Sequence, residues 1–276
     1  MLRLENITKI YATDLVLKNI TWEVKKGEKI GLVGSNGSGK TTQFKIITGE
    51  EEQTSGSVIK ESNLKISYLK QEFDINLNNT VREELCSAFV DIQLISQQIK
   101  QLEIKMSKDL DSTDKAGLNN LVYKIGALQR DFESLGGYQI QAEVDKILPK
   151  LGFSPSESYD LVSNFSCGWQ MKIALGKIML LKPDLILLDE PTNHLDLDTI
   201  NWLEQYLLTL KTSMILISHD RYFLDKLCQK IIFIDDGTAY TYNGNYSFFV
   251  QQKLLNEQSQ NKAYQLQQKE IEIQKK

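Results

Sequence analysis

Two short segments of the chain carry the side chains best suited to chemistry on phosphate, and the first is a glycine-rich loop. Gly34–Thr41 reads Gly-Ser-Asn-Gly-Ser-Gly-Lys-Thr and fits the phosphate-loop pattern G-x-x-x-x-G-K-[ST]. In such a loop, glycines let backbone amides converge on phosphate oxygens, Lys40 neutralises charge on the terminal phosphates, and the Thr41 hydroxyl ligates magnesium. A chance glycine-rich turn is the alternative, and the strand and helix expected around the loop argue against it.

The second segment supplies two carboxylates. Leu185–Glu190 reads Leu-Ile-Leu-Leu-Asp-Glu, an apolar strand that ends in acids, and α/β sheets place ligands at this edge. Asp189 would hold magnesium directly or through water, and Glu190 would polarise the attacking water. A strand capped by solvated acids is the alternative. The two segments together predict binding of a nucleotide with Mg²⁺, in which the nucleotide-binding residues are Gly34, Ser35, Asn36, Gly37, Ser38, Gly39, Lys40, Thr41 and Thr42.

An α/β fold must position these residues. The β-rich segment Lys29–Val33 runs directly into the loop, and Thr41–Thr48 lacks Gly and Pro and stops at Gly49, which predicts a helix. The dipeptide Asp236-Gly237 has the chemistry of a hairpin turn. We expect an antiparallel portion near the front of the chain. The other predicted strands are Leu2–Asn6, Ile20–Val24, Ser57–Lys60, Lys65–Leu69, Leu185–Asp189, Ser213–Ser218, Ile231–Asp235 and Ala239–Tyr242.

The middle of the chain has a different pattern. Between Val81 and Leu148 there is no proline, and apolar residues recur at three- and four-residue steps from Ile92 to Met106. A second helical run, Leu118–Phe132, follows a polar stretch. We predict a long helical hairpin over about 88–135.

Composition and charge exclude several classes of protein. The net charge of −4 provides no general basic field for nucleic acid, and the three cysteines lack any metal-ligand spacing, so they are expected to be reduced thiols. The N-terminus does not resemble a signal peptide, and the longest apolar stretches are far shorter than a membrane span. We expect a soluble protein without a membrane span of its own. The expected compartment is the cytoplasm, with the stroma of an organelle as the alternative.

Further motifs make the chain resemble the ATP-binding-cassette (ABC) superfamily. Phe165-Ser-Cys-Gly-Trp-Gln170 is similar to the signature LSGGQ, and it precedes the Asp189-Glu190 strand as in that family. The resemblance implies an ABC-type nucleotide-binding domain with a helical signature subdomain, and ATP with Mg²⁺ as ligands. It also implies an adenine-stacking role for Tyr11, metal and catalytic roles for Gln71, and a switch-histidine role for His219. Without the resemblance, Tyr11 could equally be a surface or core aromatic, and His194 suits a polar loop.

The signature implies a partner. In the family, the residues corresponding to Ser166 and Gly168 close over ATP held by a different cassette, so a second cassette is expected to complete the site. Cys167 occupies a position that is usually glycine. If that position requires positive φ or close approach to phosphate, a side chain there is costly.

Within the superfamily, the chain is most similar to ABC-F proteins, which act on the ribosome. The motifs that carry this are Tyr68-Leu-Lys-Gln71-Glu72, Gly168-Trp-Gln-Met171, Glu190-Pro-Thr-Asn-His-Leu-Asp196, Ser218-His-Asp-Arg-Tyr-Phe223 and Asn243-Gly-Asn-Tyr-Ser247. The hairpin resembles the ABC-F arm. Its six basic and seven acidic side chains between Asp91 and Glu133 give it no net attraction for RNA, so contact with ribosomal RNA is implied by the resemblance alone.

We therefore predict an ABC ATPase domain over 1–250, with the arm as an insertion, and the start of a polar helical linker over 251–276. The sequence contains no second phosphate loop or signature, so it suggests a fragment, a truncated product or a half-size protein that borrows a partner. Two other functions stay open. One is the ATPase subunit of a membrane transporter, and the other is a regulatory module that holds ATP but hydrolyses it poorly.

Overall fold

The computed structural model describes residues 1–12, 14–72, 74–109, 115–256 and 258–259. Within these, the side chains of 108, 109, 115 and 116 are not described. The chain forms two compact units, one made of 1–72 with the chain from Pro183 onward and the other of 73–182. No described helix combines the length and apolarity that a membrane crossing requires.

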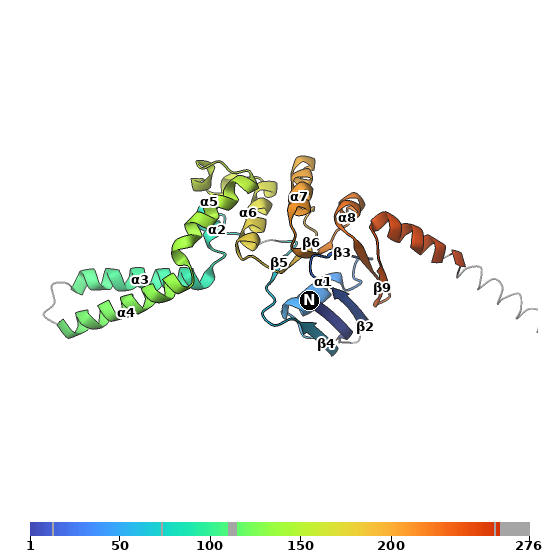
Figure 1. The fold of residues 1–276 in the computed structure, drawn as a ribbon, viewed down its shortest axis with the longest axis horizontal. Helices are drawn as coiled ribbons and strands as arrows, with labels where there is room; N and C mark the ends of the chain where they lie inside the picture. The colour runs from blue at the N-terminus through green and yellow to red at the C-terminus, as the bar shows by residue number, and fades with distance from the viewer. Residues whose placement is uncertain (13, 73, 110–114, 257, 260–276) are drawn as a thin grey trace, which may run out of the picture. The chain divides into compact units, whose positions relative to one another are not determined.

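The first unit contains a six-stranded sheet that carries the phosphate loop (Figure 1). Its strand order is β5-β6-β7-β3-β8-β9, with every pair parallel except the hairpin β8-β9. Helices α7 (Leu197–Thr209) and α8 (Arg221–Leu227) connect strands of this sheet, whereas α1 (Lys40–Thr48) leads from β3 to β4 of the other sheet. The strands are β3 (Lys29–Gly34), β5 (Ile66–Leu69), β6 (Leu185–Asp189), β7 (Ser213–Ile217), β8 (Lys230–Asp235) and β9 (Thr238–Tyr242).

A three-stranded antiparallel sheet completes the core of this unit. Its order is β2 (Asp14–Val24), β1 (Leu2–Tyr11) and β4 (Ser55–Lys60). Side chains from both sheets and from α1 join one apolar cluster, which includes Leu4, Trp22, Phe44 and Leu187. The predicted antiparallel portion is confirmed. β1 and β2 are longer than the alternation predicted, because irregularities in their pairing interrupt the pattern while the hydrogen-bonded ladder continues.

The second unit is helical. The predicted hairpin is confirmed as α3 (Val90–Asp109) and α4 (Lys115–Ser134), which lie side by side in Figure 1. Residues 110–114 of the predicted polar stretch lie outside the described residues. The rest of the unit packs α2 (Val81–Cys86), α5 (Ile140–Leu151) and α6 (Cys167–Leu180) together. A capping box between Thr80 and Glu83 begins α2.

After β9, a helix spans 246–256, starting earlier than the linker boundary predicted at residue 251. Its anchor is Phe249, which is only 3% exposed and packs against Phe233, Tyr242 and Tyr246. The sequence pattern draws attention to Leu254 and Leu255 instead, and both are exposed. Leu266, Ile271 and Ile273, the other sparse apolar residues of this segment, lie outside the described residues.

We expect Phe249→Ala to release the 246–256 helix from the sheet, lowering the free energy of its local opening by about 3 kcal/mol, because a buried phenyl ring leaves its contacts. Hydrogen exchange of amides in 246–256 measures this change. Phe248→Ala, which truncates the neighbouring half-exposed ring, is the matched control. Equal exchange rates in the two variants would contradict the anchoring role.

Candidate functional site

The phosphate loop joins β3 to α1 and has a shape that requires glycine. Gly37 and Gly39 have φ values of 79° and 87°, in the left-handed region. A Cβ on Gly39 would lie 2.5 Å from a Leu17 side-chain carbon, and one on Gly34 would lie 2.7 Å from the carbonyl oxygen of Ile234. The backbone is therefore held against β2 and β8, which presents the loop and the first turn of α1 to the cavity beside it.

That cavity has a volume of about 580 Å³ and lies within the first unit. It brings together most of the side chains that the sequence predicts for nucleotide, metal and catalysis. Gly34, Ser35 and Ser38 belong to the same loop but do not line the cavity. Val16, Asn193 and Ile217 are additional lining residues that were not among the predicted site residues. The predicted residues that line it are Tyr11, Asn36, Gly37, Gly39, Lys40, Thr41, Thr42, Gln71, Asp189, Glu190 and His219.

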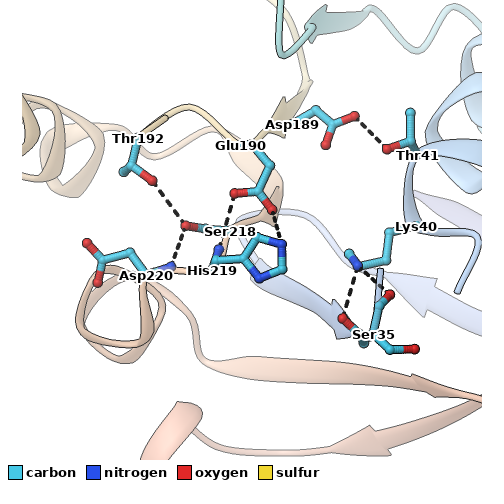
Figure 2. Close-up of polar contacts among 10 residues, drawn as sticks. Ser35, Lys40, Thr41, Asp189, Glu190, Thr192, Ser218, His219 and Asp220 are labelled. Carbon is cyan, nitrogen blue, oxygen red and sulfur yellow. Dashed lines mark hydrogen bonds and ion pairs between the residues drawn. The ribbon is translucent and has the colours of Figure 1, made fainter. Parts of the chain in front are cut away.

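Two groups of the loop fit a phosphate ligand. Burial lowers the pKa of the Lys40 ammonium, and the negative charges of Glu190 and Asp189 partly offset this shift. Its Nζ donates to the carbonyl oxygens of Gly34 and Ser35, at 3.0 and 2.9 Å (Figure 2). The Ser38 hydroxyl is buried, and no hydrogen-bond partner for it exists among the described residues. A buried polar group without a partner is costly, so this hydroxyl marks the loop as a place where folding leaves a donor unsatisfied.

Asp189 and Thr41 form the oxygen set that suits magnesium. The Thr41 hydroxyl donates to Asp189 Oδ2 at 2.9 Å, and the Tyr68 hydroxyl donates to the same oxygen at 3.0 Å. Carboxylate and hydroxyl oxygens are hard ligands that fit Mg²⁺, which also keeps water and phosphate oxygens around it. The described residues contain no group of three or more His, Cys, Asp or Glu side chains that could hold a metal ion by themselves. Tyr68 was not among the predicted site residues.

Glu190 is buried beside His219. Its Oε2 accepts from the backbone N–H of His219 at 3.2 Å, and its Oε1 lies 3.4 Å from His219 Nε2 (Figure 2). Burial raises the pKa of the Glu190 carboxyl, against the opposing effect of His219. The backbone φ of Glu190 is 50°, a strained conformation that its N–H stabilises by donating to the Ile217 carbonyl at 2.8 Å. A carboxylate with a raised pKa is a stronger base towards a bound water.

His219 is positioned by the turn between β7 and α8. The Ser218 hydroxyl accepts from the Asp220 N–H at 3.0 Å and lies 3.3 Å from the Thr192 hydroxyl (Figure 2). Asp220 in turn caps α8. His219 is thereby placed at the cavity with a largely exposed side chain. His194 is exposed and does not line the cavity, in agreement with the prediction of a polar loop residue.

Tyr11 lies at the rim of the cavity, at the end of β1. It is 40% exposed, and the Lys9 ammonium is 4.8 Å from its ring centroid. Lys9 also pairs with Glu51 at 3.0 Å, and burial raises the pKa of the Tyr11 hydroxyl. One ring face is therefore engaged by Lys9, which leaves the exposed part of the ring for an aromatic base.

Ser166 and Gly168 belong to the second unit, at the start of α6. Ser166 and Cys167 are exposed, whereas Gly168 is buried. Cys167 is the first residue of α6 and is not among the residues with positive φ, so its side chain causes no backbone strain. The backbone conformation at position 167 therefore does not require glycine. Gln170 steadies the preceding turn by donating to the Phe165 carbonyl at 2.9 Å.

The chain is similar to known proteins over most of its length. Residues 17–193 match the model of a family described as ABC transporter, and residues 232–276 match a second model with the same description. ABC transporter F family member 5 of Arabidopsis thaliana is 48% identical over 98% of this chain and 39% of its own length. The energy-dependent translational throttle protein EttA of Mycobacterium tuberculosis is 32% identical over 91% of this chain and 43% of its own.

The chain thus spans about two fifths of the length of these curated relatives. Among solved structures, an ATP-binding cassette in a dimeric, post-hydrolysis state bound to ADP and Pi matches with a TM-score of 0.62. It is 21% identical, and the match covers 88% of this chain and 98% of the other. At this identity the likeness establishes the fold.

The raised pKa of Glu190 predicts a pH-dependent stability. Between the ordinary glutamate pKa and the raised value, the folded chain binds more protons than the unfolded chain, so stability falls as the pH rises through this window. Gln cannot ionise, and it keeps an acceptor for the His219 N–H. We therefore expect Glu190→Gln to be more stable than the unchanged chain at neutral pH, with the difference vanishing below about pH 4.

Thermal unfolding between pH 4 and pH 8 measures this difference. Glu23→Gln, at an exposed glutamate of β2, is the matched control and should show no such trend. A gain from Glu190→Gln that is equal at every pH would contradict a buried, ionising carboxylate.

Proposed function

Because this chain belongs to the ABC transporter family, and within it to the F subfamily, we propose that it binds and hydrolyses ATP as part of a protein that acts on the ribosome. The single observation that carries the ATPase proposal is the cavity beside the phosphate loop. Lys40, the Thr41–Asp189 pair and the Glu190–His219 pair all line it. These are the groups needed to hold phosphates, a metal ion and an attacking water.

Each group has a role that its chemistry supports. Lys40 and the loop amides bind the terminal phosphates, and Tyr11 stacks on the base. Thr41 and Asp189, with Gln71 nearby on the cavity wall, hold Mg²⁺, which when bound neutralises charge on the phosphate oxygens. Glu190 accepts a hydrogen bond from the attacking water and polarises it. His219, the neighbour of Glu190, is available to the γ-phosphate.

A second cassette completes the site in this proposal. Ser166 and Cys167 are exposed at the start of α6, a helix of 14 residues, so the amides there are accessible to a nucleotide carried by a partner. ATP between two cassettes would then hold them together, and hydrolysis would release them.

Action on the ribosome is supported by the relatives and by the arm. EttA is named as a translational throttle protein, and the chain aligns with it over 91% of its residues. The α3–α4 hairpin is the structural counterpart of the predicted arm. A ribosomal partner also implies a compartment that contains ribosomes, either the cytoplasm or an organelle stroma. The ATPase subunit of a membrane transporter is the competing function, and it needs no arm.

The catalytic proposal predicts the behaviour of Glu190→Gln in the complete two-cassette protein, with the corresponding glutamate of the second cassette also replaced. ATP hydrolysis should fall by about 100-fold or more, because the base that polarises water is lost. ATP binding should persist, since Lys40 and the loop are untouched. Phosphate release and binding of a fluorescent ATP analogue measure the two properties.

Glu23→Gln serves as the control for this experiment as well. Unchanged phosphate release by the protein in which Glu190 and the corresponding glutamate of the second cassette are both replaced by Gln would exclude Glu190 as the catalytic carboxylate.

The ribosomal proposal predicts ATP-dependent co-sedimentation. The hydrolysis-deficient full-length protein should pellet with ribosomes when ATP is present, and it should lose this behaviour when 90–134 is replaced by a short Gly-Ser linker. Retained binding of the fluorescent ATP analogue is the control for folding of the shortened protein. If the intact full-length protein stays in the supernatant with ATP, the transporter function becomes the better account.

A further inference from the structure

Tyr68 connects the edge strand of the main sheet to the metal-binding carboxylate. It lies on β5, opposite Leu187 of β6, two residues before Asp189. Its hydroxyl donates to Asp189 Oδ2 at 3.0 Å, and the Thr41 hydroxyl donates to the same atom at 2.9 Å. Two donors occupy the acceptor positions of that oxygen. Among the described residues, no hydrogen bond reaches the other oxygen, Oδ1.

The ring of Tyr68 is itself held in place. Phe44, which is fully buried on α1, meets it edge to face, with ring centroids 5.6 Å apart. The Lys70 ammonium lies 5.7 Å from the ring centroid and is fixed in turn by Glu50 at 2.8 Å. These contacts support the ring in the position from which its hydroxyl reaches Asp189. A tyrosine hydroxyl has an ordinary pKa of about 10, so it is a donor across the physiological range.

Magnesium makes such a donor important. Mg²⁺ demands near-ideal octahedral geometry, so its affinity depends on the orientation of each carboxylate that serves it. Groups that orient a metal ligand without touching the ion commonly change metal affinity 10- to 100-fold when they are removed. Asp189 is only 3% exposed, so water cannot readily replace a lost donor.

We propose that Tyr68 is a positioning residue for Mg²⁺: its hydroxyl holds Asp189 Oδ2 and leaves Oδ1 available to the ion or to a water on the ion. The inference rests on the proposed ATP and Mg²⁺ site. It also gives β5 a second role, because Gln71, which lines the same cavity, follows two residues after this strand ends. Tyr68 thus ties the segment that carries Gln71 to the metal-binding carboxylate.

Tyr68→Phe in the full-length protein tests the proposal, because it removes one oxygen and keeps the ring against Phe44. The readout is binding of a fluorescent ATP analogue, measured as a function of Mg²⁺ concentration and again in EDTA. We expect the Mg²⁺ concentration for half-maximal binding to rise about 10-fold, with unchanged affinity in EDTA. Tyr240→Phe, at a half-exposed tyrosine on β9, is the matched control and should behave as the unchanged protein.

A double-mutant cycle with Asp189→Asn separates positioning from packing. In the Asp189→Asn background, Tyr68→Phe should cause no further change in the Mg²⁺ requirement, because the carboxylate that Tyr68 orients is gone. An unchanged Mg²⁺ requirement in Tyr68→Phe alone would overturn the proposal. Equal weakening of binding with Mg²⁺ and in EDTA would overturn it too, since it would mean a packing role. If the unchanged protein bound no nucleotide at all, the proposed function itself would fail.

Discussion

The arrangement of the site depends on one constraint, the parallel register of the central strands. β3 pairs with β7 and with β8, and β6 pairs with β7, so the carboxyl ends of three strands meet at one edge of the sheet. The phosphate loop follows β3, Asp189 and Glu190 end β6, and Ser218 and His219 follow β7. Because every strand in this group is buried, a shift of register would move apolar side chains as well as the site. Packing of the core and alignment of the groups proposed to be catalytic are therefore the same requirement.

The electrostatics of the site follow from this concentration of charge at a buried edge. Asp189 and Glu190 are buried in the wall of the cavity, with 3% and 9% of their surface exposed, and specific neighbours partly offset the cost of burying each charge. Two hydroxyl donors serve Asp189, whereas the backbone N–H of His219 and the Lys40 ammonium act on Glu190. The favourable interactions of Glu190 with His219 and Lys40 do not fully offset the effect of burial, so the pKa of its carboxyl is raised. The folded chain thus holds a strained and incompletely compensated carboxylate where a reacting water would be activated.

The two compact units divide the chemistry between them. The first unit contains the whole cavity, with the residues proposed to contact the base, the phosphates and the metal ion, whereas the signature-like residues at the start of α6 belong to the second. The arm is also part of the second unit, and the helix over 246–256 is anchored to the first through Phe249. In the proposed function, the first unit holds the nucleotide, and the signature-like residues and the hairpin of the second unit serve the partners.

Local patterns in the sequence predict the elements whose chemistry is contained in a few consecutive residues. The loop from Gly34 to Thr41, the helix that ends before Gly49, the apolar strand before Asp189 and the helical hairpin all belong to this class, because glycine conformations, caps and hydrophobic periods are properties of the local chain. The family resemblance adds Tyr11, Gln71 and His219, whose side chains line the same cavity as the loop.

Contacts between distant segments are decided only by tertiary structure. The hydroxyl of Tyr68 reaches Asp189 because β5 and β6 pair in one register. Phe249 packs against Phe233 because Phe233 lies on β8, far away in the sequence but close in the fold. The positive φ of Glu190 and the strain-free position of Cys167 are likewise properties of the folded backbone. Local sequence patterns do not predict such long-range contacts, because the contacts form only when the strands have paired and the core has excluded water.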